Sequence, residues 1–184
     1  SAWHRMAVEE RGLENLRTCA DALPVLQRQE VRALFERQGV LSPVELESRF
    51  EVYSEQYVLA IEVEAKLALQ IARTQVYPAA VRYLGELGKA LQEQQAMGLH
   101  PNLKLRNQLG ELLEQLNNGC DALEQALRGG HGTGAESTEG HMRHCADTLM
   151  PLIDTLRSAV DGLEAVVDDA DWPLPSYQEM LFMR

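Results

Sequence analysis

Between Ser42 and Gly98, apolar residues recur at steps of three and four with polar residues between them. This period is typical of an α-helix rather than of a strand. Ser42 and Glu45 have the spacing of a capping box, Pro43 suits the first helical position, and Gly98 suits the left-handed residue that follows a helix. The pattern predicts one very long helix with this apolar face: Leu46, Phe50, Tyr53, Tyr57, Ile61, Leu67, Ala68, Ile71, Val81, Leu84, Leu87 and Leu91.

Pro78 falls inside this predicted helix. A proline in a helix interior removes a backbone hydrogen bond at a cost of roughly 3 kcal/mol. Because the apolar pattern resumes directly after Pro78, we expect a kink and not the end of the helix. A helix of this length needs partners, so the rest of the chain is expected to pack along it.

Two short helices are expected before the long one. Residues 1–12 have the pattern of a helix end that Gly12 stops, and Thr18 with Asp21 three positions later opens the first short helix. This helix is expected to be brief, since Pro24 follows closely.

The second short helix is predicted over Glu30–Gln38, and Gly39 ends it. Val40 or Leu41 is then expected to contact the first turns of the long helix and so fix the angle at which the chain enters it. The expected buried face of this short helix consists of Val31, Leu34 and Phe35.

A turn at 99–102 leads into another amphipathic helix, and a glycine-rich stretch at 129–140 follows that helix. The composition of 129–140 predicts a flexible loop. His131 lies in this loop, which lacks the Gly-Lys-[Ser/Thr] of a phosphate-binding loop and follows no strand. The apolar face of the preceding helix is Leu105, Leu109, Leu112, Leu116, Cys120, Leu123 and Leu127.

The last long helix is predicted from about Thr138 to Asp168, with a bend at Pro151. The acidic run 168–171 would then lie at the negative end of the helix dipole, which is unfavourable for carboxylates. The predicted apolar face is Met142, Cys145, Leu149, Leu152, Leu156, Ala159, Leu163 and Val166.

Residues 172–184 form a tail rich in large apolar side chains. Pro173 and Pro175 keep its first part extended, and Ser176 with Glu179 has the spacing of a second capping box. A terminus of this composition is expected to dock on a protein surface. Its anchors would be Trp172, Leu174, Tyr177, Leu181 and Phe182.

Together these patterns predict an all-α fold. We expect an elongated antiparallel helical bundle built on one long proline-kinked helix, with two short N-terminal helices and a docked C-terminal tail. Residues 1–184 would form a single helical domain. The chain starts Ser1-Ala2 without a methionine, so it is expected to be part of a larger protein.

Composition narrows the possible partners. The formal net charge is −11, which argues against nucleic acid and anionic membranes as partners. Apolar runs are far shorter than the ~20 residues that a membrane span needs. The three cysteines have no Cys-x-x-Cys spacing, which favours a reducing, cytoplasmic setting.

Candidate chemistry is sparse. His141, His144 and Cys145 share a helix segment and could contribute to a zinc site, but a structural zinc site has four protein ligands. The ordinary interpretation is a pair of helix-end histidines beside a core cysteine. Glu64 continues the apolar face of the long helix. It is either a carboxylate at the edge of the bundle or a buried acid bonded to an arginine or a tyrosine hydroxyl, because unpaired burial is costly.

Several stretches carry a resemblance to one family: Arg11–Thr18, Ala22–Pro24, Gly39–Ser42 with Glu45 and Arg49, Ile61–Ala65, Ala79–Tyr83, Trp172–Tyr177 and Met180–Phe182. On these residues the chain resembles the C-terminal region of type III glutamine synthetases. The resemblance runs from about residue 3 to 182, and the stretch 129–140 departs from it.

The resemblance implies a parent enzyme that joins ammonia to glutamate with ATP and magnesium, in a large homo-oligomer. No motif of that family's catalytic core matches a position here. We therefore assign no catalytic, cofactor-binding or metal residue to this chain. Its expected role is packing and assembly, with the upstream catalytic domain as partner. The alternative is a free-standing helical protein-interaction module.

Overall fold

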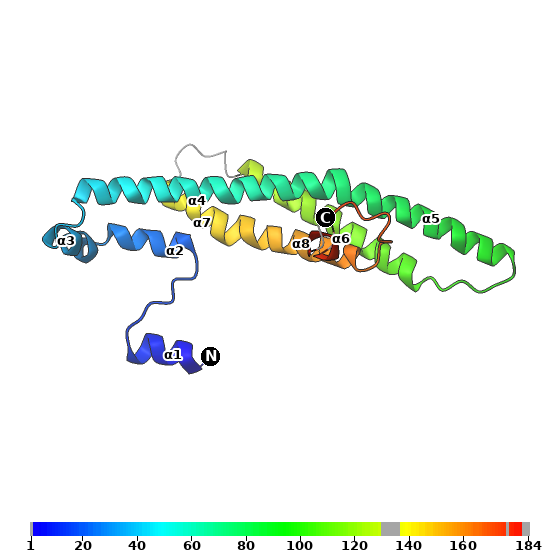
Figure 1. The fold of residues 1–184 in the computed structure, drawn as a ribbon, viewed down its shortest axis with the longest axis horizontal. Coiled ribbons are helices and arrows are strands. Elements are labelled where there is room, and N and C mark those ends of the chain that lie inside the picture. The colour runs from blue at the N-terminus through cyan, green and yellow to red at the C-terminus, as the bar shows by residue number, and fades with distance from the viewer. Residues whose placement is uncertain (1, 130–136, 176, 182–184) are drawn as a thin grey trace. The chain divides into compact units, whose positions relative to one another are not determined.

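The computed structural model describes residues 2–129, 137–175 and 177–181, and every secondary-structure element in these ranges is helical (Figure 1). The predicted all-α class is therefore confirmed. The elements are α1 (Ala2–Arg5), the π-helical turn η1 (Met6–Glu10), α2 (Cys19–Ala22), the 3-10 turn η2 (Leu23–Gln27), α3 (Gln29–Arg37), α4 (Pro43–Ile71), the π-helical turn η3 (Ala72–Val76), α5 (Tyr77–Ala96), α6 (Lys104–Gly129), α7 (Thr138–His144), the π-helical turn η4 (Cys145–Leu149), α8 (Met150–Glu164) and α9 (Tyr177–Leu181).

The chain divides into two compact units. Unit 1 comprises Ser1–Glu62 and Thr133–Thr148, and unit 2 comprises Val63–Gly132 and Leu149–Arg184. Each unit is described by itself. The single domain expected over 1–184 stays a prediction.

The predicted long helix is confirmed, since α4, η3 and α5 follow one another without a break from Pro43 to Ala96. Its capping box is formed as expected. The Glu45 backbone N–H donates to Ser42 Oγ at 3.3 Å, and the Ser42 backbone N–H donates to Glu45 Oε2 at 2.8 Å. The hydrogen bond from the Ser42 backbone lowers the pKa of the Glu45 carboxyl.

Each proline inside a helix follows a π-helical turn. Pro78 comes two residues after η3, and Pro151 comes two residues after η4. In η3 the Tyr77 backbone N–H reaches back five residues to the Ala72 carbonyl. Since a proline has no N–H and crowds the carbonyl four residues earlier, a widened turn lets the helix continue past it.

Among the glycines that the structure describes, those in the left-handed conformation are Gly12, Gly39 and Gly98. Each follows a helical segment that the sequence predicts it to end, so these predictions are confirmed. Behind Gly98 the Leu99 backbone N–H donates to the Gln94 carbonyl at 3.0 Å, which is the bond of a Schellman motif.

The apolar face of α3 is less buried than predicted. Leu34 is 45% exposed, and Val31 and Phe35 are only half-buried. Within unit 1, α2 packs against α7, where Ala20 and Met142 are fully enclosed. These elements bury the core of unit 1, and α3 lies at its margin.

Burial along α4, η3 and α5 corrects three predicted positions of the long helix. Tyr53 is 43% exposed, Leu67 is 53% exposed and Val81 is 41% exposed, whereas the small residues Ser54 and Ala72 are buried. A hydropathy pattern favours the larger side chain at each turn. The helix instead turns its small residues inward, because small residues let neighbouring backbones approach closely.

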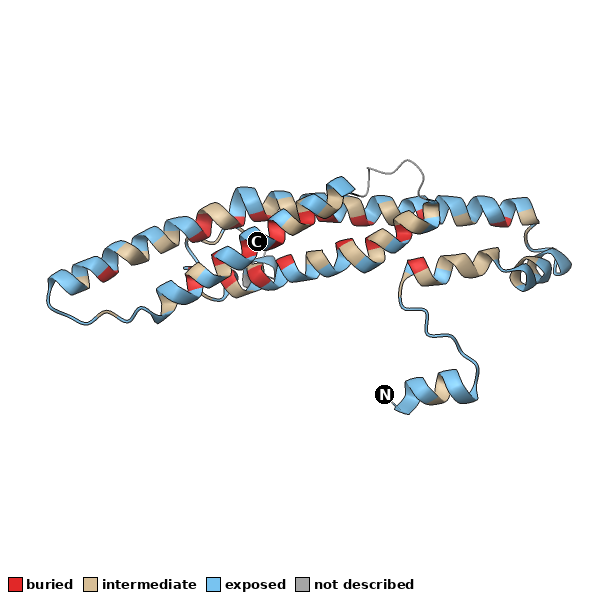
Figure 2. Ribbon diagram, turned by 180° about the vertical axis from the view of Figure 1, so that it is seen from behind, coloured by how far each residue is buried: buried red, intermediate tan, exposed pale blue. Residues whose placement is uncertain are grey.

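Unit 2 is held by the packing of α6 on α8, and α5 also packs against α6. Figure 2 shows the buried positions along one side of α6 and of α8. Glycines bring the two helices close: a Cβ placed on Gly119 would lie 3.3 Å from Leu156 Cδ1, and one on Gly162 would lie 2.7 Å from Leu112 Cδ2. Every position of the predicted faces is buried or half-buried, but the structure also buries Leu113, next to the half-buried Leu112, and it buries Val167 in place of Val166.

The predicted start of the last long helix at about Thr138 is confirmed, since α7 begins there with Ser137 as its cap. The predicted loop 129–140 is shorter at both ends, because Gly129 still belongs to α6 and Thr138 to Gly140 belong to α7. The remainder of the predicted loop, 130–136 with His131, lies outside the described residues. At the other end, α8 stops at Glu164, four residues before Asp168.

Candidate functional site

The main candidate site is an apolar groove within unit 2, which we call the Trp172 groove. Its volume is about 460 Å³. It is lined by Glu64, Leu67, Ala68, Ile71, Ala72, Ile153, Leu156, Arg157, Val160, Asp161, Glu164, Trp172 and Leu174. Most of these side chains are apolar, so the groove is suited to contact with another apolar surface and not to a charged small molecule.

Two helices form the long walls of this groove. Leu67 and Ile71 come from α4 at a spacing of one turn, and Ile153 and Val160 come from α8 at a spacing of two turns. The tail contributes Trp172 and Leu174 to the lining of the groove, and both are half-buried.

Asp168 directs the tail towards the groove. Its carboxylate accepts a hydrogen bond from the Ala170 backbone N–H at 2.9 Å. Its carbonyl accepts from the backbone N–H groups of Asp171 at 2.9 Å and Trp172 at 3.1 Å. The acidic run therefore forms a turn after the helix and does not occupy the last turn of α8, which removes the expected conflict with the helix dipole.

The indole of Trp172 has an unusual polar environment. Its Nε1 atom is enclosed and has no hydrogen-bond partner among the described residues. A buried donor without an acceptor costs about 1–3 kcal/mol. Trp172 therefore contributes apolar contact area while its polar atom stays unsatisfied.

Carboxylates surround the apolar floor. Glu64, Asp161 and Glu164 line the groove and are exposed, and its one cation, Arg157, lies 3.7 Å from Asp161. Within the described ranges, Glu64 and Glu164 make no hydrogen bond or ion pair. The interpretation of Glu64 as a buried, paired acid is therefore wrong, and the edge interpretation is confirmed.

The end of the tail behaves differently from its start. Leu181 is 77% exposed and Met180 is also exposed. The short helix α9 (Tyr177–Leu181) agrees with the expected helical turn. Ser176, Phe182 and the Tyr177 side chain lie outside the described residues, so their expected roles stay predictions.

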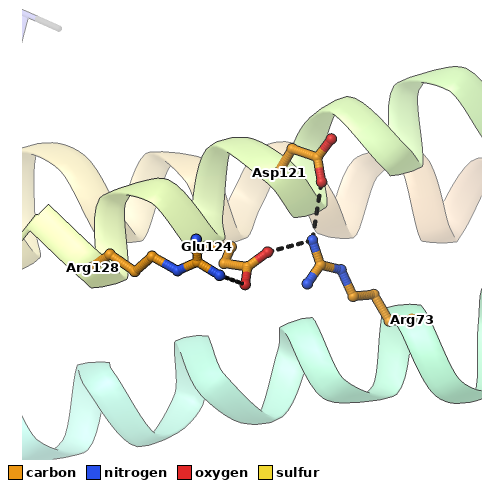
Figure 3. A network of polar contacts seen from close by, with 4 residues as sticks. All are labelled: Arg73, Asp121, Glu124 and Arg128. Carbon is orange, nitrogen blue, oxygen red and sulfur yellow. Dashed lines mark hydrogen bonds and ion pairs between the residues drawn. The ribbon is translucent and has the colours of Figure 1, made fainter.

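An ion-pair network joins η3 to α6 beside this site (Figure 3). The Arg73 guanidinium donates to Asp121 at 3.0 Å and lies 2.7 Å from Glu124, which also pairs with Arg128. The hydrogen bond from Arg73 lowers the pKa of the Glu124 carboxyl, and the same bond raises the pKa of the arginine. The network links the π-helical turn to α6, and exposed pairs of this kind stabilise the fold only a little.

The histidine and cysteine segment does not form a recognisable metal centre. Cys145 is buried, and burial raises the pKa of its thiol to about 11. A thiol with this pKa stays protonated at neutral pH, which agrees with the interpretation of Cys145 as a core cysteine. No cluster of three or more potential ligands, His141 and His144 included, was found in the part of the chain that the structure describes.

The nucleotide and magnesium that the resemblance implies also do not fit these residues. Phosphate binding needs metal carboxylates and oriented cationic or backbone donors. The described residues contain no metal-binding cluster, and the Trp172 groove is apolar with acidic edges. We therefore derive no step of phosphate chemistry from this chain.

Sequence reasoning missed the groove and the buried Ser54 hydroxyl. The groove depends on a turn at Asp168 that only side-chain geometry reveals. The Ser54 position could have been found from its spacing, since it lies four residues after Phe50 and seven before Ile61. Among the helices of the described ranges, none is long and apolar enough to cross a membrane.

A unit of packed helices with an apolar groove places the chain in the class of all-α helical domains. Residues 1–95 match the family described as "Glutamine synthetase C-terminal domain", so the chain belongs to that family.

Similar full proteins agree with this family. The chain is 30% identical over 190 residues to the type-3 glutamine synthetase of Dictyostelium discoideum, covering 99% of this chain and 25% of that protein. It is 25% identical over 190 residues to a glutamine synthetase of Bacteroides fragilis (strain YCH46), covering 99% of this chain and 26% of that protein. A glutamine synthetase of Butyrivibrio fibrisolvens is 26% identical over 184 residues, covering 94% of this chain and 25% of that protein. The chain thus spans about a quarter of the length of the curated relatives that it matches.

Proposed function

We propose that this chain is the helical C-terminal part of a glutamine synthetase and that it serves packing and oligomer assembly without taking part in the chemistry. The ligation of ammonia to glutamate, with ATP and magnesium, is assigned to the upstream catalytic portion. The expected setting is the cytoplasm, which suits the three free cysteines Cys19, Cys120 and Cys145.

One observation carries the proposal: the tail contacts its own unit with Trp172 and Leu174 but leaves Met180 and Leu181 exposed beyond them. Exposed large apolar side chains at the end of an anchored segment are typical of a protein contact. The contact would be made with the catalytic portion or with an adjacent subunit. Since the approach contains Pro173 and Pro175, little chain entropy is lost when α9 docks.

Truncation of the full-length enzyme after Pro175 tests this proposal. It removes α9 but keeps Trp172 and Leu174, so the groove stays intact. We expect smaller assemblies in sedimentation velocity and a matching loss of synthetase activity. The control is Met97→Ser, which removes another apolar side chain that is 69% exposed. If the truncated enzyme keeps both its assembly size and its specific activity, the tail has no assembly role and the free-standing interaction module becomes the better account.

A further inference from the structure

The Trp172 groove holds an unmatched combination of charge and apolar surface. Its floor is apolar, while Glu64 and Glu164 at its edge are exposed and make no ion pair within the described ranges. The nearest cation on the edge, Arg157, is already paired with Asp161. An occupant that matches this groove therefore presents apolar side chains to the floor and basic side chains to the edge.

The geometry also selects the form of the occupant. Leu67 and Ile71 on α4 and Ile153 and Val160 on α8 line the groove from two helices. A third helix can pack into a groove of this kind by placing residues spaced three and four apart against both helices. A volume of about 460 Å³ is enough for a few large side chains of such a helix and too small for a folded domain.

We propose that the Trp172 groove binds an amphipathic helix with flanking lysine or arginine residues, and that this helix belongs to the part of the full-length enzyme outside residues 1–184. The source is argued from length: the chain spans about a quarter of its curated relatives, so most of such an enzyme lies outside it. This inference rests on the proposed function and names the partner of one surface in it.

Cysteine accessibility in the full-length enzyme tests the occupancy. In a Cys19→Ser background, which removes the exposed native thiol, the reporter is Leu67→Cys in the groove. The matched control is Met97→Cys, outside the groove in the same unit. Cys120 and Cys145 are buried, and burial raises the pKa of both thiols, so they react slowly with maleimide. We expect the groove cysteine to be labelled at least tenfold more slowly than the control.

Charge reversal then tests the basic edge. Adding Glu64→Lys and Glu164→Lys is expected to restore labelling of the groove cysteine to the control rate. Reversal of two exposed acids on α6, Glu111→Lys and Glu114→Lys, is expected to leave the protection unchanged. Equal effects of both reversals would mean that net charge, and not the groove edge, governs labelling, and would overturn the proposal.

Crosslinking identifies the occupant. A photoreactive benzoylphenylalanine at Val160 is expected to crosslink to a peptide from outside residues 1–184 that carries lysine or arginine beside large apolar residues. A crosslink to residues 1–184 of a second copy, a crosslink only to the chain's own tail, or fast labelling of the groove cysteine would each overturn the proposal. Because the tail truncation removes α9 and leaves the groove, a groove that proves open while truncation still reduces assembly refutes this inference alone. The converse result refutes the proposed tail contact alone.

Discussion

The Ser54 hydroxyl is fully enclosed and has no hydrogen-bond partner among the described residues. Its position in α4 is one that close helix packing reserves for a small side chain. The volume of serine fits this position, whereas its polarity does not. A buried serine in a helix often satisfies its hydroxyl by donating to the backbone carbonyl one turn earlier. Ser54 forms no such bond within the described residues.

Ser54→Ala is therefore expected to stabilise the protein by about 1 kcal/mol, because it removes an unsatisfied buried group without leaving a large cavity. The control is Ser158→Ala on α8, where the exposed hydroxyl donates to the Asp154 carbonyl at 2.9 Å. Both changes gain similar helix propensity. The midpoint of urea unfolding should rise more for Ser54→Ala, and an equal or smaller rise would mean that the Ser54 hydroxyl is satisfied in solution.

At the level of elements, helix ends that carry a capping box or a left-handed glycine could be predicted from sequence, whereas the rotation of a helix about its axis could not. The capping boxes at Ser42 and Thr18 and the glycine at 98 depend on local chemistry that a few residues specify. The buried side of α4 depends on which neighbour can approach it, and Tyr53 outranks Ser54 in hydropathy although Ser54 is the buried one. The π-helical turns before Pro78 and Pro151 belong to the same class, since the proline is visible in sequence but the way the helix accommodates it is not.

The approach of α6 to α8 leads to a matched pair of substitutions in α6. Gly119→Leu is expected to destabilise by about 1–3 kcal/mol, because even its Cβ would lie 3.3 Å from Leu156 and the α8 backbone follows directly behind. Gly110→Leu is expected to stabilise by about 0.5–1 kcal/mol, because its Cβ meets nothing within 4 Å and the helix interior prefers leucine to glycine. Thermal unfolding followed by circular dichroism checks both, and opposite signs at the two positions are the required result.

At the level of the whole molecule, no single residue of the candidate site indicates a groove by its type or its sequence position. Leu67 and Glu64 were visible as positions on a helix, and Trp172 as a member of a tail, but their meeting in one groove depends on the turn at Asp168. The family could be inferred from sequence because short motifs survive along the chain. The groove could not, because it arises from contacts between residues about one hundred positions apart.

The acid limit of stability is also a property of the whole molecule. In the described part of the chain, hydrogen bonds lower the pKa of four carboxyl groups: Glu14 through Arg28, Asp21 through Arg143, Glu45 through Ser42 and Glu124 through Arg73. Each folded pKa lies below its unfolded value of 4.5, or 3.8 for the aspartate, so their contribution to stability is present above these values and is lost as pH falls further. At higher pH a second effect favours the folded state on acidification. Lowering the pH from 7 towards the sequence pI of about 4.9 reduces charge repulsion within a chain of formal net charge −11.

We therefore expect the melting temperature to hold or rise slightly between pH 7 and about 5 and to fall steeply below about 4.5, where the lowered carboxyl groups begin to take up protons in the unfolded state. Arg73→Gln should make the acid-side fall shallower, because it removes the guanidinium that holds the pKa of Glu124 down. Arg82→Gln is the control, since it removes the same charge at an exposed position of α5 in the same unit. Melting curves at half-unit steps of pH supply the test. If the two variants fall with the same slope as the unmodified protein, the ion pairs of Figure 3 do not contribute to the acid limit.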